Sequence, residues 1–178
     1  MALFLPTAAV ERVTDIRPDM IYAMKARAII LDVDNTLAVH GSPEPFAGTV
    51  EWVRSMERAG IRVVIMSNNF KRRVEPFAAK YRLPFLCFAM KPLPFSYWKA
   101  ARKTGVRRSE AVAVGDQIFT DVVGANLARM KSILLVPADE ESSFSFWLRR
   151  KLEQPIRRKI ASGKKGSGGT FRGKDKGK

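Results

Sequence analysis

The chain has 178 residues, of which 46% are hydrophobic and 28% charged, and its net charge is +15. This length suits one domain with a well-formed core and an additional tail. A single cysteine, Cys87, excludes a disulfide framework and fits a reducing compartment. No apolar run approaches the roughly 18 residues of a membrane span, and the N-terminus lacks the basic region of a signal peptide. We therefore expect a cytoplasmic protein.

The positive charge is concentrated near the C-terminus. Residues 147–178 contain 12 Lys or Arg residues and only 2 acidic ones. A dense basic tail suggests an anionic partner surface, either phospholipid or nucleic acid.

Short β-like runs alternate with helical segments along most of the chain. Residues 8–26 are predicted to be helical in two pieces, with Pro18 beginning the second. The predicted strands are 27–33, 61–66, 85–88, 111–115 and 132–136. The predicted helices run from Pro45 to Ala59, near 70–81, over 95–104 and after Thr120. Strands that alternate with helices indicate an α/β fold with a parallel sheet and right-handed crossovers.

The C-terminal region differs from the alternating core. Apolar residues recur every four positions within 144–160 and basic residues fill the other positions, which predicts a basic amphipathic segment over 142–162. The alternative is a docked helix whose apolar stripe completes the core. Residues 163–178 are rich in Gly, Lys and Ser and are predicted to be disordered. The expected organisation is therefore an N-terminal helical segment (1–26), a core (27–141) and these two basic segments.

Two carboxylates, Asp32 and Asp34, follow the apolar run that ends at Leu31. On an extended strand these positions point to the same side, where the carboxylates repel each other unless a cation lies between them. They also lie at the carboxyl end of a strand, where open α/β sheets place their sites. A metal ion or a charged substrate is the functional interpretation, and a simple Asx turn at Asp34-Asn35 is the alternative.

Three further strands end in polar motifs. These motifs are Ser67-Asn68-Asn69, Lys91-Pro92, and Gly115-Asp116 followed by Asp121. Taken singly, Ser67 could be a turn residue, Lys91 a solvated loop lysine and Asp116 a helix N-cap. In a parallel sheet, however, all these strand ends meet at one edge. Carboxylates, a hydroxyl and an ammonium gathered there suit phosphoryl transfer.

In the order and spacing of these four motifs, residues 27–137 resemble the haloacid dehalogenase (HAD) superfamily of phosphatases. The Asp-Asn-Thr-Leu, Ser-Asn-Asn, Lys-Pro and Gly-Asp-Gln-x-x-Thr-Asp sequences are similar to subfamily IIIA, and within it to the YqeG family. The resemblance implies a three-layer, Rossmann-like fold with a central parallel sheet. The YqeG family is related to phosphatidylglycerophosphatases, which makes phosphatidylglycerophosphate the expected substrate.

The resemblance also implies roles for individual residues. Asp32 would be the nucleophile that forms an aspartyl-phosphate, and Asp34 the general acid and base. Ser67 and Lys91 would bind the phosphate, with Asn35 and Asn68 beside them.

Mg²⁺ would be held by Asp32, the backbone carbonyl of Asp34, and Asp116. Asp121 would be either an outer-shell acid or a structural anchor. His40 follows the nucleophile loop, and an exposed loop histidine is the preferred interpretation over a catalytic one.

Motif spacing leaves no room for a large cap domain. Only 32 residues separate Asp34 from Ser67, and the segment from Ser67 to Lys91 holds one helix and one strand. We therefore expect an open site and a phosphorylated substrate presented at a surface, with residues 144–160 on the inner face of an anionic membrane. The alternative is a nucleic-acid or ribosome-associated protein that uses its basic tail, with the HAD core as a scaffold or as a phosphatase of another substrate.

Overall fold

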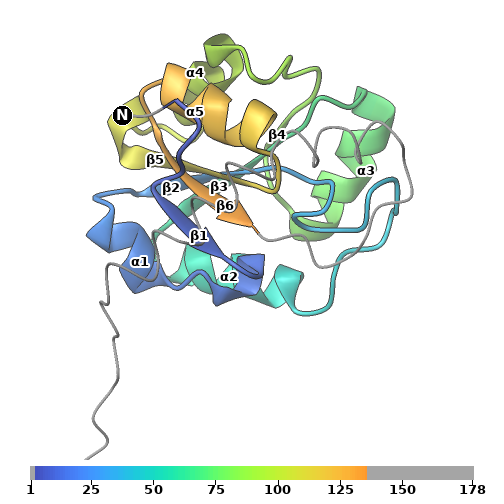
Figure 1. Cartoon of the computed structure of the whole chain (residues 1–178). Helices are drawn as coiled ribbons and strands as arrows, with labels where there is room; N and C mark the ends of the chain where they lie inside the picture. Colours follow the sequence, from blue (N-terminus) through green and yellow to red (C-terminus); the bar gives the residue numbers. More distant parts are fainter. Residues whose placement is uncertain (1–2, 136–178) are drawn as a thin grey trace, which may run out of the picture. The chain divides into compact units, whose positions relative to one another are not determined.

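A computed structural model describes residues 3–135, which form a six-stranded parallel sheet covered by helices (Figure 1). The strand order is β1-β6-β5-β2-β3-β4. The strands are β1 (Ala8–Val10), β2 (Ala28–Leu31), β3 (Arg62–Met66), β4 (Phe85–Leu86), β5 (Ala111–Gly115) and β6 (Lys131–Leu135). The predicted α/β fold with a central parallel sheet is confirmed.

The central strand β2 is fully buried, because β3 and β5 pair with its two edges and helices pack on both of its faces. Ile29 and Leu31 pack into one hydrophobic cluster, and Ala28 and Ile30 pack into the other. This alternation follows from the two-residue period of a strand. A strand buried in this way needs the continuous apolar run that the sequence shows at this point.

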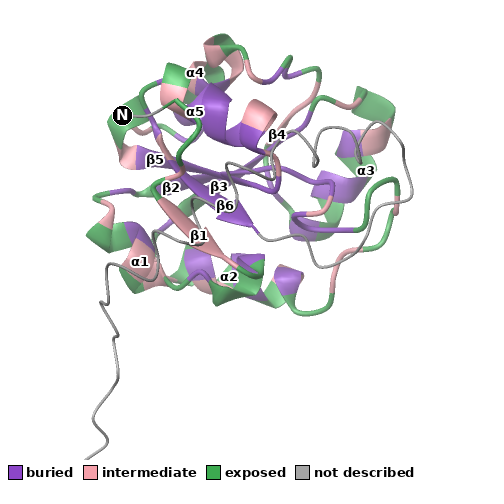
Figure 2. Cartoon of the chain, viewed as in Figure 1, coloured by how far each residue is buried: buried purple, intermediate pink, exposed green. Residues whose placement is uncertain are grey.

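Among residues 3–135, three helices cover one face of the sheet and two cover the other. Side chains of α1 (Pro18–Ala23), α2 (Thr49–Arg58) and α3 (Lys71–Tyr81) belong to the first cluster. Side chains of α4 (Pro94–Lys103) and α5 (Val123–Leu127) belong to the second. The buried strands and the inward sides of these helices form the core between the layers (Figure 2).

The face that carries α4 and α5 is lined by small residues, which lets the helices approach closely. A Cβ atom added at Gly124 of α5 would lie 2.4 Å from the ring of Tyr97 on α4. Tyr97 is fully buried, and its hydroxyl donates to the carbonyl of Thr120 at 2.8 Å. This contact ties α4 to the segment that precedes α5 and carries Asp121.

Most helix boundaries agree with the sequence prediction to within a few residues. The helix expected from Pro45 begins later, at Thr49, and Gly60 follows its end with a φ of +78°. The helix expected near 70–81 covers Lys71–Tyr81 and contains Pro76. The helix expected after Thr120 is α5, which is preceded by a π-helical turn over Ile118–Val122.

The prediction of helix throughout residues 8–26 is wrong for Ala8–Val10. These residues form the edge strand β1, which pairs in parallel with β6. A 3-10 turn (Val13–Asp15) and α1 follow, and α1 begins at Pro18 as predicted. Three half-buried residues carry too short a pattern to distinguish strand from helix, so the pairing with β6 decides their conformation.

The segments predicted as amphipathic (142–162) and disordered (163–178) lie outside the described residues. The domain boundaries at 26, 141 and 162 therefore stay predictions. Within residues 3–135, none of the helices has the length and apolar character needed to span a membrane.

Candidate active site

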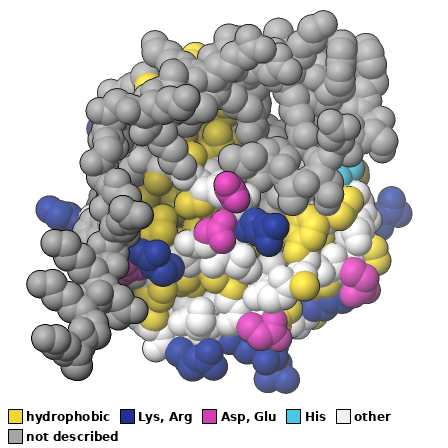
Figure 3. Space-filling view, turned by 60° about the horizontal axis from the view of Figure 1, so that its bottom comes forward, with side chains coloured by type: hydrophobic (Ala, Val, Ile, Leu, Met, Phe, Trp, Pro, Cys, Tyr) yellow, Lys and Arg dark blue, Asp and Glu magenta, His cyan; other side chains and the backbone are white. Residues whose placement is uncertain are grey.

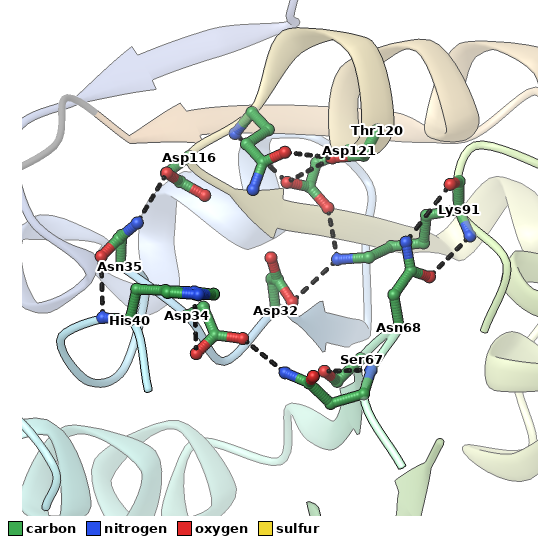
Figure 4. A network of polar contacts seen from close by, with 12 residues as sticks. Asp32, Asp34, Asn35, His40, Ser67, Asn68, Lys91, Asp116, Thr120 and Asp121 are labelled. Carbon is green, nitrogen blue, oxygen red and sulfur yellow. Dashed lines mark hydrogen bonds and ion pairs between the residues drawn. The ribbon is translucent and has the colours of Figure 1, made fainter. Parts of the chain in front are cut away.

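Polar side chains from four strand ends meet at the carboxyl edge of the sheet (Figure 4). Asp32 directly follows β2, and its backbone N–H donates to the carbonyl of Val114 on the neighbouring β5. Ser67 directly follows β3, Asp116 directly follows β5, and Lys91 lies in the loop after β4. All four side chains are buried. The structure thus brings together the residues that the sequence analysis singled out.

Lys91 is the cation at the centre of this group. Its Nζ lies 2.8 Å from Oδ1 of Asp32 and 2.8 Å from Oδ1 of Asp121. The Asn68 side chain fixes the Lys91 backbone: Oδ1 accepts from the Lys91 N–H at 2.7 Å, and Nδ2 donates to the Lys91 carbonyl at 3.3 Å. Asn68 therefore positions Lys91, while its predicted contact with phosphate stays a prediction.

Burial controls the protonation of this pair. Loss of solvent raises the pKa of Asp32, the Lys91 charge opposes this effect, and the Asp121 carboxylate adds to it, so that the pKa is about 7. Burial alone would lower the pKa of Lys91, but the carboxylates of Asp121 and Asp32 outweigh it and raise that pKa above its usual range. Lys91 is therefore charged, and one lysine does not satisfy the surrounding carboxylates.

The carboxylates of Asp32, Asp116 and Asp121 could hold a metal ion. Each offers an oxygen, and these three oxygens lie within 4.8 Å of one another. Three buried carboxylates near a single lysine leave excess negative charge, which a divalent cation would neutralise. An all-oxygen set of donors also fits a hard divalent cation. Asp121, whose role the sequence left open, thus belongs to the candidate metal site.

A glycine makes room for Asp121. A Cβ atom added at Gly115 would lie 2.3 Å from the Asp121 carboxyl carbon. The Gln117 N–H donates to Oδ2 of Asp121 at 3.2 Å, so the other oxygen of the carboxylate can face Lys91. The Gly-Asp-Gln sequence therefore shapes the site through Gly115 as well as through Asp116.

The Asp34 carboxylate points away from the other three (Figure 4). Its oxygens accept hydrogen bonds from the Gly41 N–H at 3.1 Å and from Asn69 Nδ2 at 2.7 Å. His40 Nδ1 lies 3.5 Å and an Arg73 guanidinium nitrogen 3.7 Å from its Oδ1. The carboxylate of Asp34 is thus held outside the metal cluster.

Asn35 connects the Asp34 loop to the metal cluster. Its Nδ2 donates to Oδ2 of Asp116 at 3.4 Å, and its Oδ1 accepts from the His40 N–H at 3.1 Å. The backbone of Asn35 has a φ of +56°, a left-handed conformation that asparagine tolerates better than most residues. Asparagine therefore suits both the backbone and the contacts at this position.

Sequence reasoning missed two groups around Asp34. It assigned no role to Arg73, and it named Asn69 only as a member of the Ser-Asn-Asn motif. It also preferred an exposed loop position for His40, whose side chain is 43% exposed yet contacts Asp34. The Ser-Asn-Asn motif carried a signal for Asn69, whereas Arg73 lies on the first turn of α3 and no motif marks it.

A separate cavity of about 270 Å³ lies beside the loop that follows β2. Its lining includes Arg12 and Thr14 near β1, together with Asn35, Thr36 and Phe46. The cavity shares Asn35 with the site, and neither Asp32 nor Lys91 lines it.

Comparisons with known proteins agree with this geometry. Residues 36–129 match the haloacid dehalogenase-like hydrolase family. "Probable phosphatase YqeG" of Bacillus subtilis (strain 168) is 34% identical over 153 residues, which cover 86% of this chain and 89% of that protein. The chain belongs to the haloacid dehalogenase-like hydrolase family.

Solved structures show the same fold at low sequence identity. An uncharacterised protein from Listeria monocytogenes serotype 4b matches with a TM-score of 0.52 at 16% identity, over 65% of this chain and 84% of that one. The cobalt-bound deoxy-D-mannose-octulosonate 8-phosphate phosphatase of Haemophilus influenzae matches with a TM-score of 0.50 at 13% identity, over 78% and 91% of the two chains. These likenesses support the fold.

Proposed function

We propose that this phosphatase hydrolyses the phosphomonoester of phosphatidylglycerophosphate with Mg²⁺ as its metal ion. The observation that carries the catalytic part is the buried Asp32–Lys91 pair at 2.8 Å, next to the carboxylates of Asp116 and Asp121. A nucleophile, a fixed cation and a divalent-metal site are the components that phosphoryl transfer requires.

In the first step, an oxygen of Asp32 attacks phosphorus, and the bond from phosphorus to the substrate alcohol breaks. Lys91 neutralises charge on the nucleophile and on the phosphate oxygens. Ser67 donates its hydroxyl hydrogen to a phosphate oxygen. Asp34 gives its proton to the departing alkoxide oxygen, which leaves as the alcohol.

In the second step, water attacks phosphorus in the aspartyl-phosphate. Asp34, now ionised, takes a proton from this water, and the bond between phosphorus and Asp32 breaks. Inorganic phosphate leaves, and both carboxyl groups return to their starting states. Mg²⁺ bound by Asp32, Asp116 and Asp121, with the backbone carbonyl of Asp34, would stabilise negative charge on the phosphate.

The short segments between the site motifs support a lipid substrate. One loop, α2 and β3 occupy the chain between Asp34 and Ser67, and α3 and β4 occupy most of the chain between Ser67 and Lys91. Neither segment contains an inserted domain that would enclose a small metabolite. A phosphate that protrudes from a lipid surface can reach such a site without a closing lid.

The test is Mg²⁺-dependent phosphate release from phosphatidylglycerophosphate in mixed micelles, compared with sugar phosphates and nucleotides. Asp32→Asn removes the nucleophile, and we expect a loss of about 10³-fold or more. Asp19→Asn is a matched control, because this aspartate is exposed on α1 and pairs with Arg17. It should keep wild-type activity.

Each other outcome contradicts a different part of the proposal. Hydrolysis of soluble phosphates alone would retain the phosphatase and refute the lipid substrate. Folded protein that releases phosphate from none of these compounds would refute the enzymatic proposal. In that case the nucleic-acid-binding alternative would be favoured.

A further inference from the structure

Large hydrophobic side chains are exposed on the two loops that carry catalytic motifs and on the first turn of α4. Phe70 follows the Ser-Asn-Asn motif and is 56% exposed; the others surround Lys91 in the chain and are Phe88 (55%), Met90 (63%), Leu93 (45%) and Phe95 (63%). The rings of Phe70 and Phe88 meet edge to face at 4.6 Å, so the two loops adjoin. We call these five residues the apolar rim. An apolar surface next to a binding site marks an interaction surface.

The backbone holds part of the apolar rim outward at an energetic cost. Phe88 and Met90 both have a φ of +50°, which is unfavourable for bulky residues. Hydrogen bonds from the Phe88 N–H to the Asn69 carbonyl and from the Ala89 N–H to the Ser67 carbonyl fix this conformation. Ala89 is buried between its two exposed neighbours. The conformation that places Lys91 thus also presents Phe88 and Met90 to solvent.

The stretch of chain that includes the apolar rim is rich in basic residues. Residues 70–108 contain eleven Lys or Arg residues and a single acidic residue, Glu75. Five of the eleven pair with carboxylates, namely Lys71, Arg73, Lys80, Lys91 and Arg107. Arg72 lies over the Phe70 ring at 5.9 Å, and Arg108 lies over the Trp98 ring at 5.7 Å. Within residues 3–135, neither of these guanidinium groups pairs with a carboxylate. Arg72 therefore presents an unpaired cation beside Phe70 of the rim, whereas Arg108 precedes β5 at the opposite edge of the sheet.

Exposed aromatic rings beside arginine and lysine suit the interface of a lipid bilayer. The rings bury their apolar parts among the acyl chains, and the cations contact anionic headgroups. A second copy of this surface and the basic segment 147–178 carry the same sign of charge as the basic residues beside the rim, so they are poor partners for it. An anionic lipid surface has the complementary charge.

We propose that the apolar rim docks the site onto an anionic membrane. Ser67 lies three residues before Phe70, and Lys91 lies between Met90 and Leu93 in the chain, so docking would bring headgroup phosphates to the residues proposed to bind them. The proposal deepens the proposed function, because its orientation rests on a lipid substrate. It concerns a surface distinct from residues 144–160.

The first experiment measures co-sedimentation of the full chain with vesicles of phosphatidylglycerol and phosphatidylcholine, and with phosphatidylcholine alone. The double variant Phe88→Asn/Met90→Asn removes two rim side chains and supplies a residue that tolerates a positive φ. We expect its partition onto phosphatidylglycerol vesicles to fall at least tenfold. Tyr22→Ser is the control: this half-exposed tyrosine on α1 contacts the carbonyl of Ala59 after α2, and the variant should bind as wild type does.

A second measurement shows that the variant site is intact. Hydrolysis of the water-soluble p-nitrophenyl phosphate should be unchanged in Phe88→Asn/Met90→Asn, while hydrolysis of a lipid phosphomonoester in vesicles should fall with binding. Equal vesicle binding by the double variant and wild type would overturn the proposal. Failure of the wild-type protein to bind phosphatidylglycerol vesicles would also overturn it. The same holds if, in a parallel assay with RNA, the double variant lost RNA binding but still bound vesicles.

Failure of this proposal and failure of the proposed function give different results. Rim-dependent vesicle binding without hydrolysis of lipid phosphate would support the docking surface and refute the substrate. Hydrolysis of phosphatidylglycerophosphate without rim-dependent binding would support the substrate and refute the docking surface.

Discussion

Lys91 pairs with two buried carboxylates, so its removal should affect both catalysis and stability. Lys91→Met leaves Asp32 and Asp121 buried without their cation. We expect metal-free protein to lose about 3–5 kcal/mol of unfolding free energy, as when one partner of a buried ion pair is removed. Phosphate release should fall about 10²-fold or more, because a fixed cation stabilises charge in the transition state.

Urea unfolding in a chelator and phosphate-release assays would measure these effects. Lys71→Met is the control, because this lysine is exposed on α3 and pairs with Glu75 at 3.4 Å. A Lys91→Met protein as stable and active as the control would show that Lys91 has no such role.

The raised pKa of Asp32 predicts a pH dependence of stability in metal-free protein. The folded state holds a proton on Asp32 up to a pH of about 7, whereas an unfolded aspartate loses it near 3.8. The folded state thus binds more protons between these values, and unfolding free energy decreases as pH rises through this window. The stabilisation that comes from the proton on Asp32 is complete below pH 3.8 and is lost above pH 7.

Asp32→Asn removes this titrating group while keeping the size of the side chain. The difference in unfolding free energy between wild type and Asp32→Asn, measured in a chelator, should therefore change in favour of the variant from pH 5 to pH 8. A difference that is independent of pH would contradict the assignment of the raised pKa to Asp32.

Residues with a motif signature were predictable from the sequence, and their supporting contacts were not. Asp32, Asp116 and Lys91 directly follow or closely succeed strands, so the parallel topology brings them together. The contact of Arg73 with Asp34 depends on how α3 approaches the loop after β2, which no local pattern encodes. Asp121 was singled out, but its distance from Asp32 and Asp116 depends on the π-helical turn at Ile118–Val122.

At the scale of elements, the contact between α4 and α5 leaves no space for one additional carbon. Alanine favours helix over glycine by about 0.8–1 kcal/mol, yet a Cβ at position 124 would lie 2.4–2.6 Å from three atoms of Tyr97. Tyr97 is fully buried and bound to the Thr120 carbonyl, so it has little freedom to move. We expect overpacking to dominate, and Gly124→Ala to lose about 1–3 kcal/mol.

Chemical unfolding of Gly124→Ala beside Leu127→Ala would test this expectation. Leu127 is exposed on the same helix, so its substitution tests helix propensity without a change in the core, and about 0.5 kcal/mol or less is expected. A Gly124→Ala protein more stable than wild type would mean that helix propensity outweighs the contact with Tyr97.

The elements that sequence reasoning placed well are those with long internal patterns. β2, β3 and β5 have continuous apolar runs, and α2 and α4 end just before glycines with positive φ. β1 and β4 contain three and two residues, and their conformation is set by pairing with β6 and β3. β4 is shorter than predicted because the chain turns after Leu86, where Phe88 donates its N–H to the Asn69 carbonyl.

Over the described residues, the buried charges of the site differ from those of the surface: carboxylates outnumber lysine inside the site. The site buries several carboxylates and one lysine, whereas on the face shown in Figure 3 acidic and basic side chains are mixed with hydrophobic ones. The buried carboxylates come from the ends of β2 and β5 and from the turn before α5. A metal ion at this point would therefore link separate parts of the fold, and its binding free energy would add to the stability of the whole.

Metal binding should stabilise the chain against unfolding through the Asp32, Asp116 and Asp121 cluster. At a Mg²⁺ concentration about 100 times the dissociation constant, the unfolding free energy should rise by about 2.7 kcal/mol. Asp116→Asn removes a charged ligand and should abolish most of this increase. Asp34→Asn should preserve it, because the Asp34 carboxylate faces Gly41 and Asn69 and the substitution keeps the backbone carbonyl.

Asp34→Asn should at the same time lose phosphatase activity, since the amide cannot exchange the proton. Thermal or urea unfolding over a range of MgCl₂ concentrations, with ionic strength held constant by NaCl, separates specific binding from screening. If Asp34→Asn lost the Mg²⁺ response and Asp116→Asn kept it, the metal would lie on the other side of Asp32. The division between a metal-binding and a proton-transferring carboxylate would then be reversed.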